Sequence, residues 1–193
     1  DRVSVDRFFA TLADQAGPPD ILVNAAGISV HDRVEEHSES DWLNVIDVNL
    51  NGPFRTTRAV LGTMKAKKWG RIVNVGSTAA TTAAETHAAY CASKAGLLGL
   101  TRAVAVEGAP FGVTCICVSP TWVETDMLRA SAKQMAKRAG HTQAEEIAAI
   151  AKANPQNRLV QPSEVAEMVS FVCSNLTPAL TMEDIQINAG AHW

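Results

Sequence analysis

The stretch "RIVNVGS", Arg71–Ser77, is a mostly apolar run that ends in a glycine and a serine. The stretches "ILVNAAG" at 21–27 and "VTCICVSP" at 113–120 share this arrangement. Continuous apolar runs of this length are typical of strands that are buried on both faces, and small or polar residues mark their ends. The three runs therefore predict three buried strands of one sheet.

Segments long enough for helices separate these runs. Asp41 to about Lys67 follows an entry with capping-box character, and Ala88 to about Gly108 ends at Gly-Ala-Pro. Connections of this length are typical of parallel strands. Another amphipathic helix precedes the first run, because apolar residues recur at helical spacing: Val5, Phe8, Phe9 and Leu12.

The rest of the chain continues the alternation of helices and strands. Two helices rich in Ala, Lys and Glu follow residue 127, then a helix from Pro162 to Ser174, and then a last strand in "DIQIN" at 184–188. This order predicts an α/β fold with a doubly wound, Rossmann-like parallel sheet in three α/β/α layers. No repeat or linker interrupts it, so residues 1–193 are expected to form one domain.

The composition limits the possible partners. With 193 residues, 47% hydrophobic and 19% charged, and a formal net charge of -3, the chain lacks the clustered basic charge that nucleic acid or an anionic membrane requires. The four cysteines have neither disulfide density nor metal spacing, and Cys115 and Cys117 share a strand face, which favours packing. We expect no metal, no nucleic-acid or membrane partner, and a cytoplasmic location.

A phenol and an ammonium lie four residues apart in "ETHAAYCASKAGLLGL", residues 85–100. On a helix, Tyr90 and Lys94 are neighbours on one face, and the ammonium is expected to lower the pKa of the phenol. The small residues around them would let a ligand approach closely. Such a pair is also common between solvated helix neighbours, so it does not establish a function by itself.

Five stretches together are more specific than this pair. "ILVNAAG", "DVNLNG", "GRIVNVGS", "AAYCASKAGLLGLTRAVAVE" and "VSPTWVETDM" occur in this order over essentially the whole chain. In this combination the sequence resembles the short-chain dehydrogenase/reductase family, classical type. The resemblance implies an NAD(P)-dependent oxidoreductase that interconverts a ketone and a secondary alcohol.

The resemblance also implies roles for four residues. Tyr90 would be the catalytic acid/base, Lys94 would lower its pKa and hold the nicotinamide ribose, and Ser77 would hydrogen-bond the substrate oxygen. Asn49 matches the residue that bends its helix and holds a water in the proton relay. Two alternatives stay open: Ser77 terminates a strand without a catalytic role, and Asn49 only bends its helix.

The cofactor, NAD or NADP, would meet two other segments. The residues carried over from the family are Asn24, Ala25, Ala26, Gly27, Pro120, Val123 and Thr125, together with Tyr90 and Lys94. Ala25 replaces an asparagine of the family pattern and Thr121 replaces a glycine, while the ending "INAGAHW" departs from Asp-Gly-Gly. If position 121 requires a positive φ, the loop should take another path. Thr125 and Asp126 have the alternative role of capping the following helix.

Nothing in the chain matches the strand and glycine-rich turn with which family members open. We therefore expect an N-terminally incomplete domain that lacks the first strands and the glycine-rich cofactor-binding segment, so that the choice between NAD and NADP cannot be read. An open sheet of this kind would expose an apolar edge and one uncovered helix face.

The substrate and partner predictions follow from the same resemblance. The segment from Met127 to Arg158 is loosely similar to lids of ketoreductases, which makes 3-ketoacyl thioesters and cyclic ketones the candidate substrates. Pairing into a homo-oligomer, a dimer or a homotetramer, is expected through 41–67, 88–108 and the last strand. The alternative function is a truncated, non-catalytic binding or scaffolding protein on a dehydrogenase fold. The five histidines are expected on the solvated surface: His31, His37, His87, His141 and His192.

Overall fold

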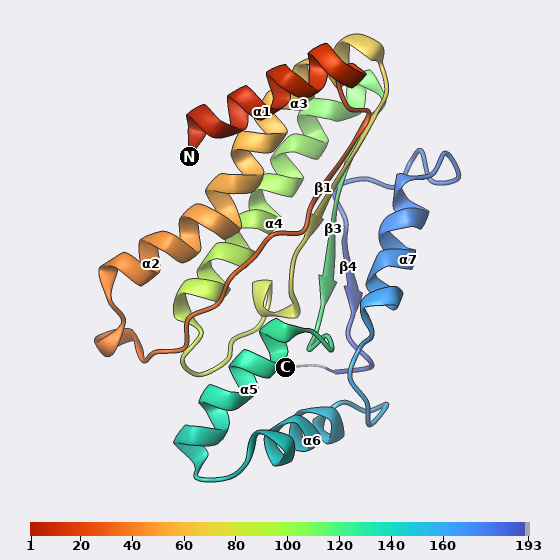
Figure 1. The fold of residues 1–193 in the computed structure, drawn as a ribbon. Coiled ribbons are helices and arrows are strands. Elements are labelled where there is room, and N and C mark those ends of the chain that lie inside the picture. Colours follow the sequence, from red (N-terminus) through yellow and green to blue (C-terminus); the bar gives the residue numbers. More distant parts are fainter. Residues whose placement is uncertain (192–193) are drawn as a thin grey trace.

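A four-stranded parallel sheet forms the centre of the molecule. The computed structural model describes residues 1–191. The strands lie in the order β1 (Ile21–Asn24), β2 (Gly70–Val75), β3 (Val113–Pro120) and β4 (Asp184–Ile187). All three pairings are parallel, with Val73 opposite Val23 on one side and Ile116 on the other. The predicted strands and their parallel arrangement are confirmed (Figure 1).

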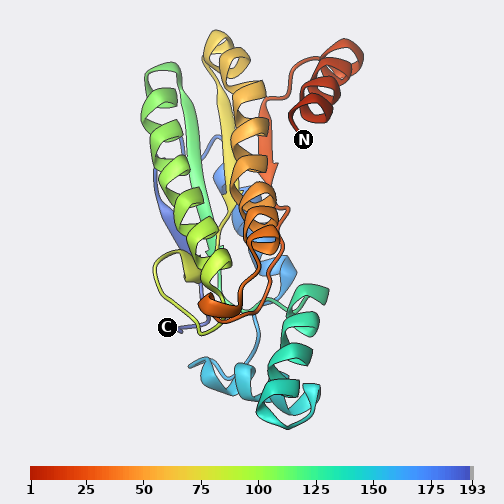
Figure 2. The same ribbon diagram turned by 90° about the vertical axis from the view of Figure 1, so that its left-hand side faces the viewer.

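Helices cover both faces of this sheet. On one face lie α3 (Gly52–Lys67) and α4 (Ala88–Gly108), with α1 (Arg2–Ala16) beside α3, and on the other face lies α7 (Pro162–Cys173) (Figures 1 and 2). Each face has its own apolar cluster. Val60, Met64, Ile72, Val104 and Val113 pack under α3 and α4, whereas Val73, Ile116, Val118 and Val172 pack under α7. The three-layer α/β/α architecture is confirmed.

Two helices lie beyond the carboxyl ends of the strands. α5 (Asp126–Ala139) and α6 (Gln143–Ala153) pack on one another there, away from both layers of covering helices (Figure 1). Thr125 caps α5 and Thr142 caps α6, the latter in a capping box with Glu145. These two helices place apolar side chains over the end of the sheet.

The segment predicted as one helix from Asp41 to Lys67 is divided. α2 (Glu39–Ile46) passes into a five-residue π-turn, Asp47–Asn51, and α3 follows without a break. The wide turn lets the buried Asn49 side chain leave the helix toward the chain that follows β1.

The burial of the strands differs between the centre and the edge. All eight residues of β3 are buried, but on β1 Ile21 is 45% and Val23 42% exposed. The prediction that the first run is buried on both faces is therefore wrong, because the cluster under α7 includes residues of β2 and β3 but none of β1. Phe8 on α1 is exposed as well, so the predicted exposed apolar edge is present.

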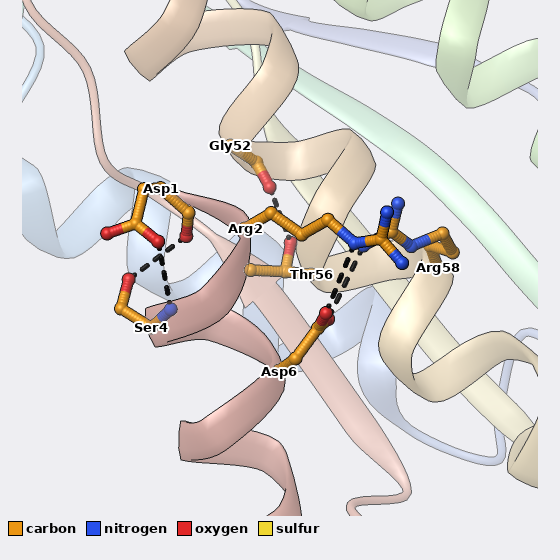
Figure 3. A network of polar contacts seen from close by, with 7 residues as sticks. All are labelled: Asp1, Arg2, Ser4, Asp6, Gly52, Thr56 and Arg58. Atoms are coloured by element: carbon orange, nitrogen blue, oxygen red, sulfur yellow. Dashed lines mark hydrogen bonds and ion pairs between the residues drawn. The ribbon is translucent and has the colours of Figure 1, made fainter.

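Polar contacts at the start of α1 join it to α3 (Figure 3). Asp1 caps α1 by accepting from the Ser4 backbone N–H at 3.1 Å, and Asp6 pairs with Arg2 at 3.3 Å and with Arg58 of α3 at 3.4 Å. These ion pairs are exposed and so contribute little to stability. The packing of Phe9 against the cluster under α3 is the stronger restraint on α1.

A series of hydrogen-bonded polar side chains links α3, β1, β2 and α4 on one face of the sheet. Asn24 of β1 donates to Asn74 of β2 at 2.8 Å, and Asn74 donates to Thr101 of α4 at 2.9 Å. Asn74 and Thr101 are fully buried. Thr56 of α3 completes the chain by donating to Asn24 at 2.7 Å.

Replacing Asn74 tests this chain of hydrogen bonds. Asn74→Ala leaves Asn24 and Thr101 without their shared partner, which should lower the free energy of unfolding by about 1–3 kcal/mol in urea titrations. Asn44→Ala, at an exposed position of α2, is the control and should change it by less than about 0.5 kcal/mol. Equally small effects at both positions would show that these hydrogen bonds contribute nothing to stability.

Candidate active site

A cavity of about 360 Å³ opens at the carboxyl ends of the strands. Its walls come from the segments after β1, β2 and β3, from the first turns of α4 and α5, and from α7. Of the residues singled out in the sequence, the following line it: Ala25, Gly27, Ser77, Tyr90, Lys94, Pro120, Val123 and Thr125. Asn24, Ala26 and Asn49 do not.

Tyr90 and Lys94 face this cavity from the first two turns of α4. The Lys94 ammonium nitrogen lies 5.6 Å from the centre of the Tyr90 ring. Lys94 is buried, and its Nζ donates to the Val75 carbonyl oxygen at the end of β2 at 2.8 Å. The helical spacing has therefore placed both groups in the same cleft, as predicted.

Burial is the largest influence on the pKa values of Tyr90 and Lys94. Desolvation raises the pKa of Tyr90 above its usual value of 10.0, and a side-chain hydrogen bond with Ser77 opposes this only in part. Desolvation also lowers the pKa of Lys94 to about 8. The expectation that the phenol's pKa is lowered is thus wrong for the free protein, because desolvation raises it and Lys94 is not among the groups that shift it. The phenol is protonated at neutral pH.

Ser77 begins a short 3₁₀ turn directly after β2. Its Oγ accepts from the backbone N–H of Ala79 at 3.1 Å, so the hydroxyl proton is directed elsewhere, and the side-chain hydrogen bond with Tyr90 is the one that it can donate in the free protein. The preceding Gly76 lies against β3, where an added Cβ would come closer than 3.0 Å to Cys117 Sγ and Ser119 Oγ. Only glycine lets the chain pass here and bring Ser77 to the cavity.

Asn49 connects three segments behind the cavity. Its Oδ1 accepts from the Ile28 N–H at 2.9 Å, and its Nδ2 donates to the Ile28 carbonyl at 2.9 Å and to Ser93 Oγ at 3.0 Å. Both amide protons are therefore engaged, and one lone pair of Oδ1 remains. Ser93 in turn donates to the Tyr90 carbonyl at 2.7 Å. Asn49 thus bends its helix and also links it to the Tyr90 backbone.

The segments predicted to meet the cofactor are divided between two cavities. Asn24 and Ala26 line a second hollow of about 460 Å³ beside β1 and α1, and Ala25 lies between the two. Asn24 instead joins the sheet-crossing hydrogen bonds, in keeping with a role in steadying the sheet. These hydrogen bonds form without an asparagine at position 25.

The loop after β3 does not require a positive φ at Thr121. Thr121 has no positive φ, and its N–H donates to the Ile187 carbonyl of β4 at 3.1 Å. Thr125 caps α5 through the Leu128 N–H at 3.4 Å, so the capping alternative is confirmed, and Thr125 also lines the cavity. In the atypical ending, Ala189 adopts φ 50 and Asn188 donates to the Ala191 carbonyl at 2.9 Å.

Two histidines that were predicted at the solvated surface, His31 and His87, are buried. His31 and His87 are 3% and 6% exposed, and their rings meet edge to face with centroids 4.1 Å apart. The expectation of a solvated surface is wrong for both, because the chain after β1 folds under α5. The sequence feature that could have indicated the burial of His87 is its position three residues before Tyr90, next to the predicted site. His192 lies outside the described residues.

The cysteines are packing residues. Cys115 and Cys117 are buried in β3, and burial raises their pKa values to about 12 and 11, so both are protonated thiols. Within residues 1–191, no group of His, Cys, Asp and Glu side chains is arranged to hold a metal. None of the helices described is both long and apolar enough to cross a membrane.

Comparison with known proteins agrees with this arrangement. Residues 1–192 match the family model described as Enoyl-(Acyl carrier protein) reductase. The 3-oxoacyl-(acyl-carrier-protein) reductase FabG of Vibrio cholerae is 35% identical over 98% of this chain and 73% of its own length. The chain belongs to the short-chain dehydrogenase/reductase family.

Two further similar proteins are named as a dehydrogenase and a ketoreductase. D-beta-hydroxybutyrate dehydrogenase of Rhizobium meliloti is 32% identical over 94% of the chain and 70% of its own length. A solved structure of actinorhodin polyketide ketoreductase with NADPH has a TM-score of 0.95 and 34% identity, covering 100% of this chain and 75% of that one. The protein is an NAD(P)-dependent oxidoreductase of ketones and secondary alcohols, and nothing supports the non-catalytic alternative.

The cavity fits the nicotinamide end of such a cofactor. A Cβ added at Gly27 would lie 3.6 Å from Asn49 Oδ1 and 3.7 Å from Lys94 Nζ, so the Gly27 backbone borders both polar atoms. The Lys94 ammonium has three donors, and within residues 1–191 its hydrogen-bond partner is the Val75 carbonyl. The remaining donors and the open space suit a ribose hydroxyl.

The pH dependence of stability tests the burial of His31. Burial, His87 and Arg138 lower its pKa from 6.5 to about 4. Between these values the unfolded chain binds a proton that the folded chain does not, so acidification should lower the free energy of unfolding, by on the order of 3 kcal/mol. In urea titrations, His31→Gln should reduce this slope, whereas Asn44→Ala, at an exposed site of α2 that carries no titratable group, should not. Identical slopes for wild type and His31→Gln would contradict the burial.

Proposed function

We propose that this protein reduces a ketone to a secondary alcohol with NADPH, and that 3-ketoacyl thioesters and cyclic ketones are its substrates. The observation that carries the proposal is the protonated Tyr90 phenol in one cavity with Ser77 and Lys94. A protonated phenol beside Ser77 and Lys94 is placed to donate its proton to a carbonyl oxygen during reduction. Relatives named as ketoacyl reductases and a ketoreductase structure with NADPH support the substrate class and the cofactor.

The chain's own groups supply the steps around the hydride transfer. The bound nicotinamide supplies a hydride to the carbonyl carbon. Ser77 donates a hydrogen bond to the carbonyl oxygen as negative charge develops there, and Tyr90 donates its proton to the same oxygen. Lys94 stabilises the phenolate that remains, because its ammonium lies 5.6 Å from the ring centre.

Three further groups have supporting roles in this proposal. Lys94 would hold the nicotinamide ribose beside Gly27, and the loop with Pro120, Val123 and Thr125 would hold the nicotinamide amide and the phosphates. Asn49 fixes the backbone of Ile28 and, through Ser93, that of Tyr90. Its free Oδ1 lone pair would hold a water that passes a proton from solvent to the Tyr90 phenolate.

Apolar side chains in the cavity lining favour an apolar substrate body. Met127 and Leu128 of α5 and Val165 of α7 line it, and all three are apolar. A ketone within an alkyl chain or a ring buries such a surface favourably. The segment 127–158, which contains α5 and α6, would act as the substrate lid.

A homo-oligomer, a dimer or tetramer, and a cytoplasmic location complete the proposal. Exposed apolar side chains on the helices predicted to pair support association: Trp42, Leu43, Phe54 and Val106. Sedimentation of the full-length protein as a monomer alone would contradict it.

Replacing Tyr90 by Phe tests the proposed proton donor. In the full-length protein, Tyr90→Phe should lower kcat by at least about a hundredfold on acetoacetyl-CoA and on 1-tetralone, because no neighbouring group replaces the acid. NADPH binding, followed by nicotinamide fluorescence, and the melting temperature should remain those of the wild type. Cys91→Ala, at the next position of α4, is the control and should retain its activity.

Three results would count against the proposal. Undiminished turnover by Tyr90→Phe would remove the role of the phenol. Inactivity of the wild type on every thioester would remove the thioester substrates, and equal inactivity on cyclic ketones would remove the whole substrate class.

A further inference from the structure

The two helices beyond the sheet, α5 and α6, share an apolar cluster of their own (Figure 1). Leu128 and Ala132 of α5 and Ile150 of α6 form it together with Leu159. The clusters on the two faces of the sheet contain no residue of α5 or α6. A pair of helices that bury their apolar faces against each other, and not against the sheet, can move as one unit.

The chain enters and leaves this α5–α6 unit at one place. Val123, before α5, forms an isolated parallel bridge with Val160, after α6. The Val160 N–H donates to the Trp122 carbonyl at 3.1 Å, and the Glu124 N–H donates to the Val160 carbonyl at 2.9 Å. The two connections of the unit are therefore fixed side by side, which is the arrangement that a hinge requires.

Arg138 holds the other end of α5. It lies in the last turn of that helix, and its Nη2 donates to the His31 carbonyl oxygen and, at 3.0 Å, to Asp32 Oδ1. Two turns earlier on the same face of α5, Ser131 Oγ lies 2.9 Å from His31 Nε2. The chain after β1 thus grips α5 along the half of the helix that is farther from the bridge.

The gripped segment is itself fixed to the candidate active site. The Asp32 N–H donates to the Thr86 carbonyl at 3.0 Å. The rings of His31 and His87 meet edge to face, with centroids 4.1 Å apart. His87 directly precedes α4, the helix that carries Tyr90. Holding α5 to residues 31 and 32 therefore holds it to the segment that leads to the phenol.

This contact is weak enough to open. The side chains of Arg138 and Asp32 are 45% and 35% exposed, so water and salt compete with the ion pair. An ion pair at this exposure, together with a charge-assisted hydrogen bond to a carbonyl, changes an equilibrium by roughly three- to tenfold. A contact of this strength favours one position of α5 without locking it.

From this arrangement we infer that Arg138 is a positioning residue that latches the α5–α6 unit closed over the cavity. When the latch opens, the unit turns about the bridge between Val123 and Val160, admits the ketone and releases the alcohol. Arg138 does not line the cavity, so its effect on the reaction is indirect. The inference rests on the proposed function, in which the segment 127–158 is the substrate lid.

The rates at which a ketone enters and leaves the full-length protein test the latch. The probe is 1-tetralone with NADP⁺ in place of NADPH, so that no hydride is transferred, followed by tryptophan fluorescence in a stopped-flow instrument. Arg138→Gln should raise the dissociation rate constant about three- to tenfold and should not lower the association rate constant. With NADPH, KM should rise by a similar factor and kcat should stay within about twofold, because the same closed complex reacts.

Three further variants separate a latch from a general effect on α5. Lys137→Gln is the control, because it removes the same charge from the adjacent, exposed position, which has no hydrogen bond or ion pair within residues 1–191. It should keep the wild-type rate constants. Arg138→Lys retains the charge and should restore most of the effect. Asp32→Asn should raise the dissociation rate constant in the wild type but add little to Arg138→Gln, since both changes break one contact.

The inference is overturned if Arg138→Gln leaves the dissociation rate constant and KM unchanged, or if Lys137→Gln changes them equally. It is also overturned if kcat falls as much as KM rises, because the cavity itself would then be distorted. Binding of 1-tetralone without its reduction would contradict the proposed function, while the rate constants would still test the latch. Absence of binding by any of the proposed ketones would overturn both.

Discussion

The side-chain amide of Asn49 is the contact on which the site depends. It hydrogen-bonds the backbone of Ile28 in both directions and donates to Ser93, which donates to the Tyr90 carbonyl. Three segments far apart in the sequence meet at this fully buried group: the chain after β1, the turn between α2 and α3, and α4. The π-turn at 47–51 is the local cost of bringing the amide there, since such turns are rare in a regular helix.

Burial then determines the chemistry of the groups that these contacts bring together. Around Tyr90 and Lys94 the cavity walls remove solvent, which favours the neutral form of both side chains. The same effect keeps His31 and His87 neutral beside them. Among the described residues that line the cleft there is no Asp or Glu, so no fixed negative charge there repels an anionic transition state.

Much of this could be predicted from the sequence, because periodicity and motif order are local properties. The apolar runs gave the strands, the spacing of Tyr90 and Lys94 gave their common face, and the ordered motifs gave the family. The π-turn at Asn49 could not be seen within an uninterrupted helical pattern. Exposure of Ile21 and burial of His31 depend on which segments pack against them, and that is a tertiary property. The direction of the Tyr90 pKa shift was wrong for the same reason: sequence spacing reports the charged neighbour and says nothing about solvent.

The account depends most directly on the protonation state of Tyr90. The chain contains a single tyrosine, so the difference in ultraviolet absorbance between wild type and Tyr90→Phe, recorded across alkaline pH, isolates the ionisation of this phenol. The account predicts a pKa above the ordinary value of 10.0 in the free protein. A phenol that ionises at or below that value would contradict it, because Tyr90 would then be either solvated or governed by the Lys94 charge.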